Sequence, residues 1–297
     1  MASNADRRAV ERARAKINLT LHVVGRRGDG YHLLESFVVF AEAGDELAFA
    51  PADRFALEVA GPFGGGLSGG GDNLVLRAAH ALSERFPGRI PPTHLTLAKH
   101  LPVSSGIGGG SADAAAALRG LCALAGLSPG GDTLHELARG LGADVPVCLE
   151  SRATFMAGIG ERLSAAPGLP AHGAVLVNPG HAVSTPDVFA RLDLTPGEGA
   201  GASHPPLPAG GWRTAEELAG LLGACRNDLE IPARALVPEI DQVLDALEAC
   251  PGTLLARMSG SGATCFALFG SRADADAAAG RIATAHPGWW VVATAFR

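Results

Sequence analysis

Apolar and polar residues alternate along several short stretches of the chain, which is the pattern of half-buried β-strands. This alternation predicts strands over residues 15–24, 34–41, 46–50, 93–98, 153–157, 174–178, 263–269 and 290–296. Helix-like segments lie between them and predict helices over residues 72–86, 132–142, 238–249 and 273–285, together with an Ala/Leu-rich helix that ends before Gly126. The interleaving of the two kinds of element predicts an α+β chain in two parts.

Capping residues and chain breakers refine this pattern. Asp72 and Asp132 are the predicted N-caps of their helices, and residues 214–217 (Thr-Ala-Glu-Glu) fit a capping box. Glycine and proline gather over residues 158–170, which we interpret as the boundary between the two parts. Residues 193–211, also rich in glycine and proline, predict a loose loop.

The composition limits the class of protein. The chain has 297 residues, of which 47% are hydrophobic, so it is long enough for two domains with sizeable cores. Its formal net charge of −6 argues against nucleic-acid binding, and no apolar run is long enough to suggest a membrane span. Arginines near the N-terminus are interrupted by acidic residues, which predicts a solvated tail. Five widely spaced cysteines without a CxxC pair predict reduced, buried thiols in a cytoplasmic protein.

The most informative stretch is residues 101–117, which follow the strand predicted over 93–98. It reads Leu-Pro-Val-Ser-Ser-Gly-Ile-Gly-Gly-Gly-Ser and then enters the alanine-rich helix. A helix N-terminus offers unpaired N–H groups and the positive end of the helix dipole, and glycine lets the backbone approach a phosphate closely. The order of strand, glycine-rich loop and helix therefore predicts an anion site. The alternative is a flexible turn before an ordinary helix.

Two common phosphate motifs fit this loop poorly. A Walker A loop ends in Gly-Lys-Ser/Thr, whereas Gly110 is followed directly by Ser111. A dinucleotide fingerprint that starts at Gly106 would place Ser111 where a third glycine or alanine belongs. The loop therefore indicates a different class of phosphate-binding protein.

Three further segments carry candidate chemistry, and each has a structural alternative. Lys16 and Asn18 lie on the polar face of the first predicted strand, which is by default a solvated face. Asp144 lies in residues 142–148, predicted as a tight turn into an apolar strand, where aspartate is usually a turn former. Residues 257–266 form a second small-residue loop before a strand. Together, a lysine and an aspartate suit phosphoryl transfer to an alcohol, because the lysine keeps the carboxylate ionised and attracts the developing alkoxide.

The sequence Pro102-x-x-x-Gly106-Ile107-Gly108-Gly109-Gly110-Ser111 resembles the phosphate loop of the GHMP kinases, such as galactokinase, homoserine kinase and mevalonate kinase. The resemblance implies a two-domain α+β fold, with a ribosomal-protein-S5-like ATP-binding domain over residues 1–160 and a ferredoxin-like α/β domain over 161–297. The substrate site would lie between them, with ATP and Mg²⁺ as cofactors. The implied ATP-binding residues are Pro102, Ser104, Ser105, Gly106, Ile107, Gly108, Gly109, Gly110 and Ser111. A glycine loop near the C-terminus would close over the phosphates, and it consists of Ser259, Gly260, Ser261 and Gly262.

Further segments narrow the resemblance within the family: residues 15–19, 25–32, 142–146, 185–189 and 227–230. They are similar to segments of the members that act on a cytidine diphosphate-linked methylerythritol. The resemblance implies an enzyme that uses ATP to phosphorylate a hydroxyl group of that small molecule, in isoprenoid precursor biosynthesis. It would act as a monomer or homodimer, without a nucleic-acid or membrane partner.

Residue roles follow from the same resemblance. Lys16 and Asp144 are the implied catalytic pair. Tyr31 and Phe189 would stack on the two faces of the cytosine, and His32 would hydrogen-bond its edge. The implied substrate-binding residues are Asn18, Tyr31, His32, Thr185 and Phe189.

The loop departs from the family pattern at a few positions. Ser104 and Ser105 stand where the family often has glycine or alanine, and Ala112 replaces a common serine. Asp113 falls in the first helical turn, and we interpret it as complementing the helix dipole without a catalytic role.

Two alternatives remain within the sequence evidence. The chain could be another small-molecule kinase of the family, of the homoserine or mevalonate type, and the Tyr31-His32 pair argues against this. It could also be a non-catalytic, ligand-sensing relative, against which the presence of Lys16 and Asp144 argues.

Overall fold

The structure of the chain is a computed structural model that describes residues 9–297. By its contacts the chain forms two compact units. Within the described range, unit 1 consists of residues 9–15, 44–103 and 109–150, and unit 2 of residues 16–43, 104–108 and 151–297. The chain therefore passes between the units several times. The division into domains 1–160 and 161–297 stays a prediction.

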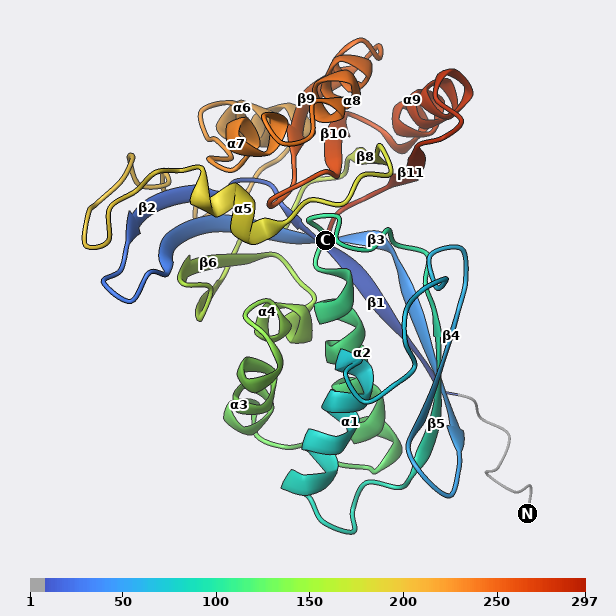
Figure 1. Cartoon of the computed structure of the whole chain (residues 1–297). Helices are drawn as coiled ribbons and strands as arrows, with labels where there is room; N and C mark the ends of the chain where they lie inside the picture. Colours follow the sequence, from blue (N-terminus) through green and yellow to red (C-terminus); the bar gives the residue numbers. More distant parts are fainter. Residues whose placement is uncertain (1–8) are drawn as a thin grey trace. The chain divides into compact units, whose positions relative to one another are not determined.

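Unit 1 packs helices against strands, and Figure 1 shows α1 and α2 side by side within it. The strand β5 pairs in parallel with β4 and antiparallel with the last residues of β3. The elements that contribute to this unit are β1 (Ala9–Asn18), β3 (His32–Pro51), β4 (Ala56–Ala60), β5 (Thr93–Ala98), α1 (Leu74–Arg85), α2 (Gly109–Leu124), α3 (Gly131–Leu141) and α4 (Val145–Glu150).

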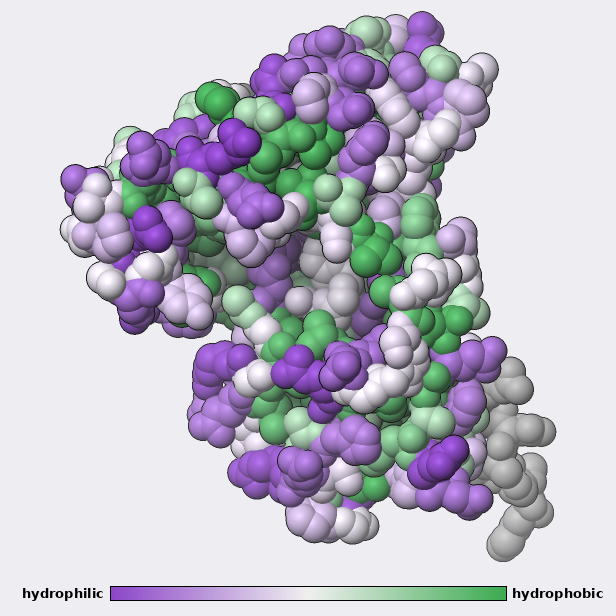
Figure 2. All heavy atoms as spheres, in the orientation of Figure 1, coloured by the Kyte–Doolittle hydropathy of each residue, from purple (hydrophilic) through white to green (hydrophobic). Residues whose placement is uncertain are grey.

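The core of unit 1 follows from the alternation of β5. Thr93, Leu95 and Leu97 point to the buried side, as the alternating pattern predicts. They share this core with the buried Phe49 of β3 and with a run of buried alanines in α2, whose small side chains allow close packing. In Figure 2 hydrophilic residues spread over the outer surface of this unit, with hydrophobic residues showing between them.

Unit 2 contains a sheet of ferredoxin-like topology. Its strands lie in the order β11-β8-β10-β9, and all three pairings are antiparallel. Helices occur between β8 and β9 and between β10 and β11, which gives the β-α-β-β-α-β sequence of that fold. The elements are β8 (Gly173–Asn178), α5 (Thr185–Ala190), α6 (Ala215–Gly223), α7 (Glu230–Arg234), α8 (Glu239–Glu248), β9 (Thr253–Met258), β10 (Cys265–Phe269), α9 (Arg272–Ala285) and β11 (Trp290–Thr294). The predicted ferredoxin-like C-terminal part is confirmed.

The rest of unit 2 surrounds the first part of β3. This part pairs antiparallel with β2 (His22–Arg26) and with β6 (Thr154–Gly158), and β6 pairs with β7 (Arg162–Ala165). β2 and β3 are joined by the turn at residues 27–31. The predicted strand over residues 15–24 is thus divided between β1 and β2.

Several boundary predictions are wrong. β3 is one strand of 20 residues where two were predicted, because Asp45 is buried and paired inside the polar run that broke the alternation. The N-cap of α1 is Asn73, whose side chain accepts from the N–H of Val75, instead of Asp72. α3 begins after Gly130 without a side-chain cap, so Asp132 lies in its first turn.

The apolar strand predicted after residue 142 is the short helix α4. Pro146 is compatible with this because the N–H groups of a first helical turn need no acceptor within the helix. Asp144 comes directly before the helix, and its carbonyl accepts from the N–H of Cys148. The tail prediction is also wrong for Arg12 and Arg14, which lie in β1, while Arg7 and Arg8 fall outside the described residues.

The loop predicted to be loose over residues 193–211 is fixed to β2 by backbone hydrogen bonds. The N–H of Arg26 donates to Glu198, and the N–H of Gly197 donates back to Arg26 at 2.7 Å. The N–H of Ala200 donates to Val24 at 3.0 Å. This part of the loop therefore extends the β2–β3 hairpin, which glycine and proline content alone did not reveal.

The predicted thiols are confirmed, because all five cysteines are free and buried. Among the described residues, no helix is both long enough and apolar enough to cross a bilayer.

Gly120 tests the packing of α2 on β3. A Cβ at this position would lie 2.1 Å from Cζ of Phe49, whereas one at Gly140 in α3 would meet nothing within 4 Å. We expect Gly120→Ala to lower the free energy of unfolding by about 1–3 kcal/mol through overpacking. Gly140→Ala should raise it by up to about 1 kcal/mol, since alanine favours a helix. Urea denaturation of both variants checks this, and equal effects would contradict the packing.

Candidate active site

The first half of the glycine-rich loop, residues 104–108, has an alternating backbone conformation. The φ angles of Ser104, Gly106 and Gly108 are +52°, +77° and +63°, while Ser105 and Ile107 are not in the left-handed region. Alternation of this kind turns successive N–H groups toward one side and creates an anion-binding concavity. It also explains why glycine suits position 104, where a serine is held in a conformation that L-residues rarely adopt.

Four consecutive carbonyls of this segment accept hydrogen bonds from within unit 2. The carbonyl of Ser104 accepts from the N–H of Val183, and that of Ser105 from the N–H of Thr264. The carbonyl of Gly106 accepts from the hydroxyl of Ser259, and that of Ile107 from the N–H of Lys16. Within the described part of the chain, the N–H groups of residues 106–108 make no hydrogen bond. The carbonyls are thus held on one side, and the donors are left for an anion.

The C-terminal glycine loop packs directly against this segment, with backbone against backbone. A Cβ at Gly106 would lie 2.6 Å from the carbonyl oxygens of both Ser259 and Gly262. A Cβ at Gly260 would in turn lie 2.6 Å from the carbonyl oxygen of Gly106. Both positions therefore need glycine for the close approach as well as for the positive φ.

Asn18 and Asn227 hold the C-terminal glycine loop. The Asn227 amide donates to the carbonyls of Met258 and Gly260, both at 2.9 Å, and the hydroxyl of Ser259 accepts from the N–H of Asn18 at 3.1 Å. The Asn18 amide donates to Ser36, which leaves Asn18 Oδ1 buried without a hydrogen-bond partner in the described residues. This oxygen is available to a hydroxyl group of a ligand.

The implied catalytic residues belong to different units. Lys16 is buried in unit 2, and its side chain lies against Gly108, where a Cβ would be 3.3 Å from Lys16 Cβ. Asp144 is half-buried in unit 1, directly before α4. The structure therefore places Lys16 against the glycine-rich loop, and both its catalytic role and its pairing with Asp144 stay predictions.

The second half of the loop, Gly109 to Ser111, forms the start of α2 in unit 1. The residue beneath it is Lys99, which the sequence analysis did not single out. A Cβ at Gly109 would lie 3.3 Å from Nζ of Lys99, so the ammonium group lies directly against the first residue of the helix. The signal in the sequence that could have indicated it is a lysine two residues before the Leu-Pro of the loop, at the end of the strand predicted over residues 93–98.

The implied cytosine site lies at the β2–β3 hairpin. The ring of His32 stacks on Phe189, with centroids 4.8 Å apart, and His32 Nε2 is buried without a hydrogen-bond partner in the described residues. Burial, and then the charge of Arg26, lower the pKa of His32, so the ring is neutral at pH 7 and its Nε2 can bond to a base. Tyr31 is 61% exposed, and its ring is accessible for stacking. The sandwich between Tyr31 and Phe189 stays a prediction.

Thr185, the remaining implied substrate residue, begins α5. Its hydroxyl lies 2.7 Å from the hydroxyl of Ser261 and so connects α5 to the C-terminal glycine loop. This contact brings the α5 segment and the glycine loop together within unit 2.

A second cluster, His22, His204 and Cys225, has ligand atoms within 4.8 Å of one another. Its atoms already have other partners. His22 Nε2 accepts from the N–H of Arg226, and His204 Nε2 lies 3.7 Å from the Cys225 sulfur. Burial lowers the pKa of both histidines and the Arg226 charge lowers it further, so both rings are neutral at pH 7. The same Arg226 charge repels a metal cation. We interpret the cluster as a neutral hydrogen-bonded core that fixes the loop at residue 204.

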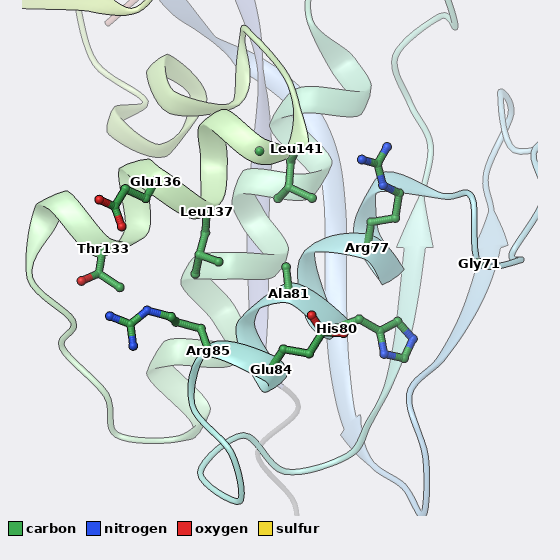
Figure 3. A pocket seen from close by; sticks show the side chains of 11 residues that line it. Gly71, Arg77, His80, Ala81, Glu84, Arg85, Thr133, Glu136, Leu137 and Leu141 are labelled. Atoms are coloured by element: carbon green, nitrogen blue, oxygen red, sulfur yellow. The ribbon is translucent and has the colours of Figure 1, made fainter.

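A surface cavity of about 550 Å³ lies elsewhere, between α1 and α3 of unit 1. Figure 3 shows charged side chains of both signs around it, among them Arg77, Arg85 and Glu136. No implied site residue lines it, so it gives no support to the predicted site.

The fold and the loop geometry define a family. The model described as "GHMP kinases N terminal domain" matches residues 73–152, and that described as "GHMP kinases C terminal" matches residues 204–287. The chain belongs to the GHMP kinases and is an ATP-dependent small-molecule kinase.

Relatives of near full length make the likeness more specific. The chain is 53% identical over 285 residues to the 4-diphosphocytidyl-2-C-methyl-D-erythritol kinase of Parvibaculum lavamentivorans, covering 96% of this chain and 97% of the relative. It is 56% identical to the enzyme of the same name from Cereibacter sphaeroides, covering 94% and 96%. A crystal structure of 4-(cytidine 5'-diphospho)-2C-methyl-D-erythritol kinase is 34% identical, with a TM-score of 0.74, and covers 96% of this chain and 99% of that one. A homoserine kinase from Cytophaga hutchinsonii, 20% identical with a TM-score of 0.67 and covering 99% and 96%, shares the fold.

Gly106→Ala tests the contact between the two glycine loops. The added Cβ would force the loops apart, and we expect nucleotide binding to weaken at least about tenfold, which corresponds to about 1.4 kcal/mol. Gly88→Ala is the matched control, because Gly88 has a φ of +70° and open space around its Cβ. Both variants carry the left-handed strain of about 1–2 kcal/mol in stability. Calorimetric titration with ADP checks this, and an unchanged affinity in Gly106→Ala would rule out the loop as the phosphate site.

Proposed function

We propose that the chain transfers the γ-phosphoryl group of ATP to the 2-hydroxyl of 4-diphosphocytidyl-2-C-methyl-D-erythritol, giving the 2-phosphate and ADP. The observation that carries the proposal is the segment 104–108, where held carbonyls leave N–H groups free beside Lys16. The relatives that match over nearly their full length are named 4-diphosphocytidyl-2-C-methyl-D-erythritol kinase, which supports the choice of substrate. The orphaned His32 Nε2 beside Phe189 supports a site for a planar base.

The chemistry required of the protein is mainly positioning and charge stabilisation. The free N–H groups of residues 106–108 donate to the phosphates of ATP, and the start of α2 adds its dipole. Asp144 accepts the proton of the attacking hydroxyl group, and Lys16 stabilises the negative charge on the oxygen. Asn18 Oδ1 accepts a hydrogen bond from the polyol, which satisfies its buried lone pairs.

Mg²⁺ is the expected companion of ATP in this reaction, where it neutralises the phosphates. It prefers oxygen ligands and keeps several waters. The one cluster with metal-ligand spacing in the described residues, His22, His204 and Cys225, offers nitrogen and sulfur and does not suit this ion. We therefore assign no protein ligand to Mg²⁺ and expect the ATP phosphates to carry it.

The direct test is an assay of ADP release with purified chain. The cytidine substrate should be phosphorylated, and homoserine and mevalonate should not. Turnover of homoserine or mevalonate instead would replace the proposed substrate within the family. Nucleotide binding without turnover of any of them would favour a ligand-sensing relative.

Asp144→Asn tests the proposed base. The amide keeps the shape but cannot accept the proton, so we expect kcat to fall at least about 100-fold with ADP affinity retained, as general-base contributions run at roughly 10²–10⁴. Asp132→Asn, an exposed carboxylate in the first turn of α3, is the control and should leave kcat unchanged. Near-normal turnover of Asp144→Asn would exclude Asp144 as the base.

Tyr31→Ala tests the cytosine site. We expect CDP and the cytidine substrate to bind more weakly by roughly 1–3 kcal/mol, the usual loss for one stacking partner, with ADP affinity unchanged. Because Tyr31 is 61% exposed, the free energy of unfolding should stay the same. Ile231→Ala, at a 78% exposed position of the same unit, is the control. If CDP binds both proteins equally in calorimetry, the proposed clamp is wrong.

A further inference from the structure

Three charged side chains lie buried beneath the start of α2, where the sequence analysis assigned only a dipole effect to Asp113. Lys99 Nζ donates to Asp45 Oδ2 at 2.5 Å and to Asp113 Oδ2 at 2.9 Å. The exposed fractions of Lys99, Asp45 and Asp113 are 3%, 0% and 4%. All three belong to unit 1, and the ammonium group lies against Gly109. Removing such charges from water costs free energy unless they are paired, so the folded state depends on the ion pairs and hydrogen bonds within this cluster.

The two carboxylates are not equally supported. Asp45 accepts three hydrogen bonds, because its Oδ1 also receives the N–H groups of His100 and Leu101 at 2.6 and 2.9 Å. Asp113 accepts one, from Lys99, and its Oδ1 is buried without a hydrogen-bond partner in the described residues. Asp113 is therefore the member of the cluster whose ionised form the fold stabilises least.

The charges around Asp113 agree with this. Burial, opposed by Lys99 and reinforced by the Asp45 carboxylate, raises the pKa of Asp113 to about 7. A carboxyl with a raised pKa binds its proton more tightly in the folded chain, so its contribution to stability is present at low pH and is lost as the pH rises toward 7. With both carboxylates ionised, the cluster carries one net negative charge at the end of α2 that would receive phosphates.

Within residues 9–150 of unit 1, several charged groups on other elements have surroundings or partners other than Asp113. The charged or titratable residues of α1 that line the cavity with α3 are Arg77, His80, Glu84 and Arg85 (Figure 3), and the ring of His80 lies against Phe55, with centroids 5.5 Å apart. Between α3 and α4, His135 pairs with Glu150. The charged groups that shift Asp113 are Lys99 and Asp45.

We propose that Asp113 is a positioning residue of the nucleotide site, which holds Lys99 under Gly109 and takes up one proton from solvent when ATP or ADP binds at the start of α2. The proton goes to the Asp113 carboxylate, which becomes a neutral carboxylic acid. The incoming phosphates add negative charge near the cluster, and protonation removes its net negative charge, so binding and protonation favour each other. The inference rests on the proposed function, because it requires nucleotide phosphates at this loop.

The sign of the pH effect follows. At low pH the proton is already bound, and nucleotide affinity is highest. As the pH rises above 7, binding must include proton uptake, and affinity falls by up to about tenfold per pH unit, the limit for one linked proton. A residue with a purely structural role would change stability without producing this slope.

The test is calorimetric titration of the full chain with MgADP at pH 7.5, in buffers of different protonation enthalpy, for wild type and Asp113→Asn. Asparagine keeps an oxygen for Lys99 but cannot titrate, so the wild type should take up more protons than the variant, by up to about 0.75 proton at this pH. Any proton that the nucleotide itself exchanges is common to both proteins. Asp132→Asn, exposed on α3, should behave as the wild type.

The outcomes separate the two proposals. If MgADP binds both proteins with equal proton uptake, Asp113 has no linked proton and the inference is wrong. Failure of the wild type to bind MgADP would instead overturn the proposed function, and this inference with it. Should Asp113→Asn not fold, the wild type decides alone: a nucleotide affinity that is flat between pH 6.5 and 8.5, after correction for free nucleotide, would overturn the inference.

Discussion

The rest of the site depends on one close approach, in which residues 104–108 lie backbone against backbone on the C-terminal glycine loop. The approach is possible because neither Gly106 nor Gly260 carries a Cβ. Its consequence is directional: the carbonyls of residues 104–107 are held by four donors from three separate segments of unit 2. A peptide whose carbonyl is fixed has its N–H fixed as well, so the donors are oriented before any anion arrives. Such preorganised donors act on charge without the cost of reorganisation.

The segment 227–230 shows how distant parts of unit 2 keep that contact in place. Asn227 holds the carbonyls of Met258 and Gly260, and the Glu230 carboxylate accepts the N–H of Met258 at 3.0 Å. Asp228 accepts the N–H of Val23 at 2.6 Å and so ties the same segment to β2. Three of these four consecutive residues thus connect the glycine loop to the hairpin that carries Tyr31. The sequence identified this segment through its resemblance to the family, but its physical role depends on contacts between residues far apart in the chain.

The sequence predicted best where the decisive interactions are local. The alternation of β5 predicted its bounds at residues 93–98. The N-cap half of the capping box predicted at residues 214–217 is present, because the Thr214 side chain accepts from the N–H of Glu217, while the Glu217 carboxylate accepts from the N–H of Arg213. Predictions failed where tertiary contacts override local pattern. The polar run near Asp45 continues β3 only because a lysine from another strand end neutralises it. The loop over residues 193–211 is held by the backbone edge of β2 and by contacts of residues 202–204 with distant parts of unit 2.

The electrostatics of the phosphate loop give the buried cluster its importance. No lysine or arginine occurs in residues 100–111, so the groups that the loop itself offers to the proposed phosphates are neutral N–H groups and the end of a helix. Lys16 lies against Gly108 in unit 2, and Lys99 lies against Gly109 in unit 1. The charge of Lys99 is more than cancelled when both of its carboxylate partners are ionised, and it is balanced when Asp113 is protonated. In the proposed site, the protonation of Asp113 therefore sets whether the charged cluster next to Gly109 has a net negative charge that repels a phosphate or no net charge. A carboxylate with one unpaired oxygen can in this way influence a site that it does not contact.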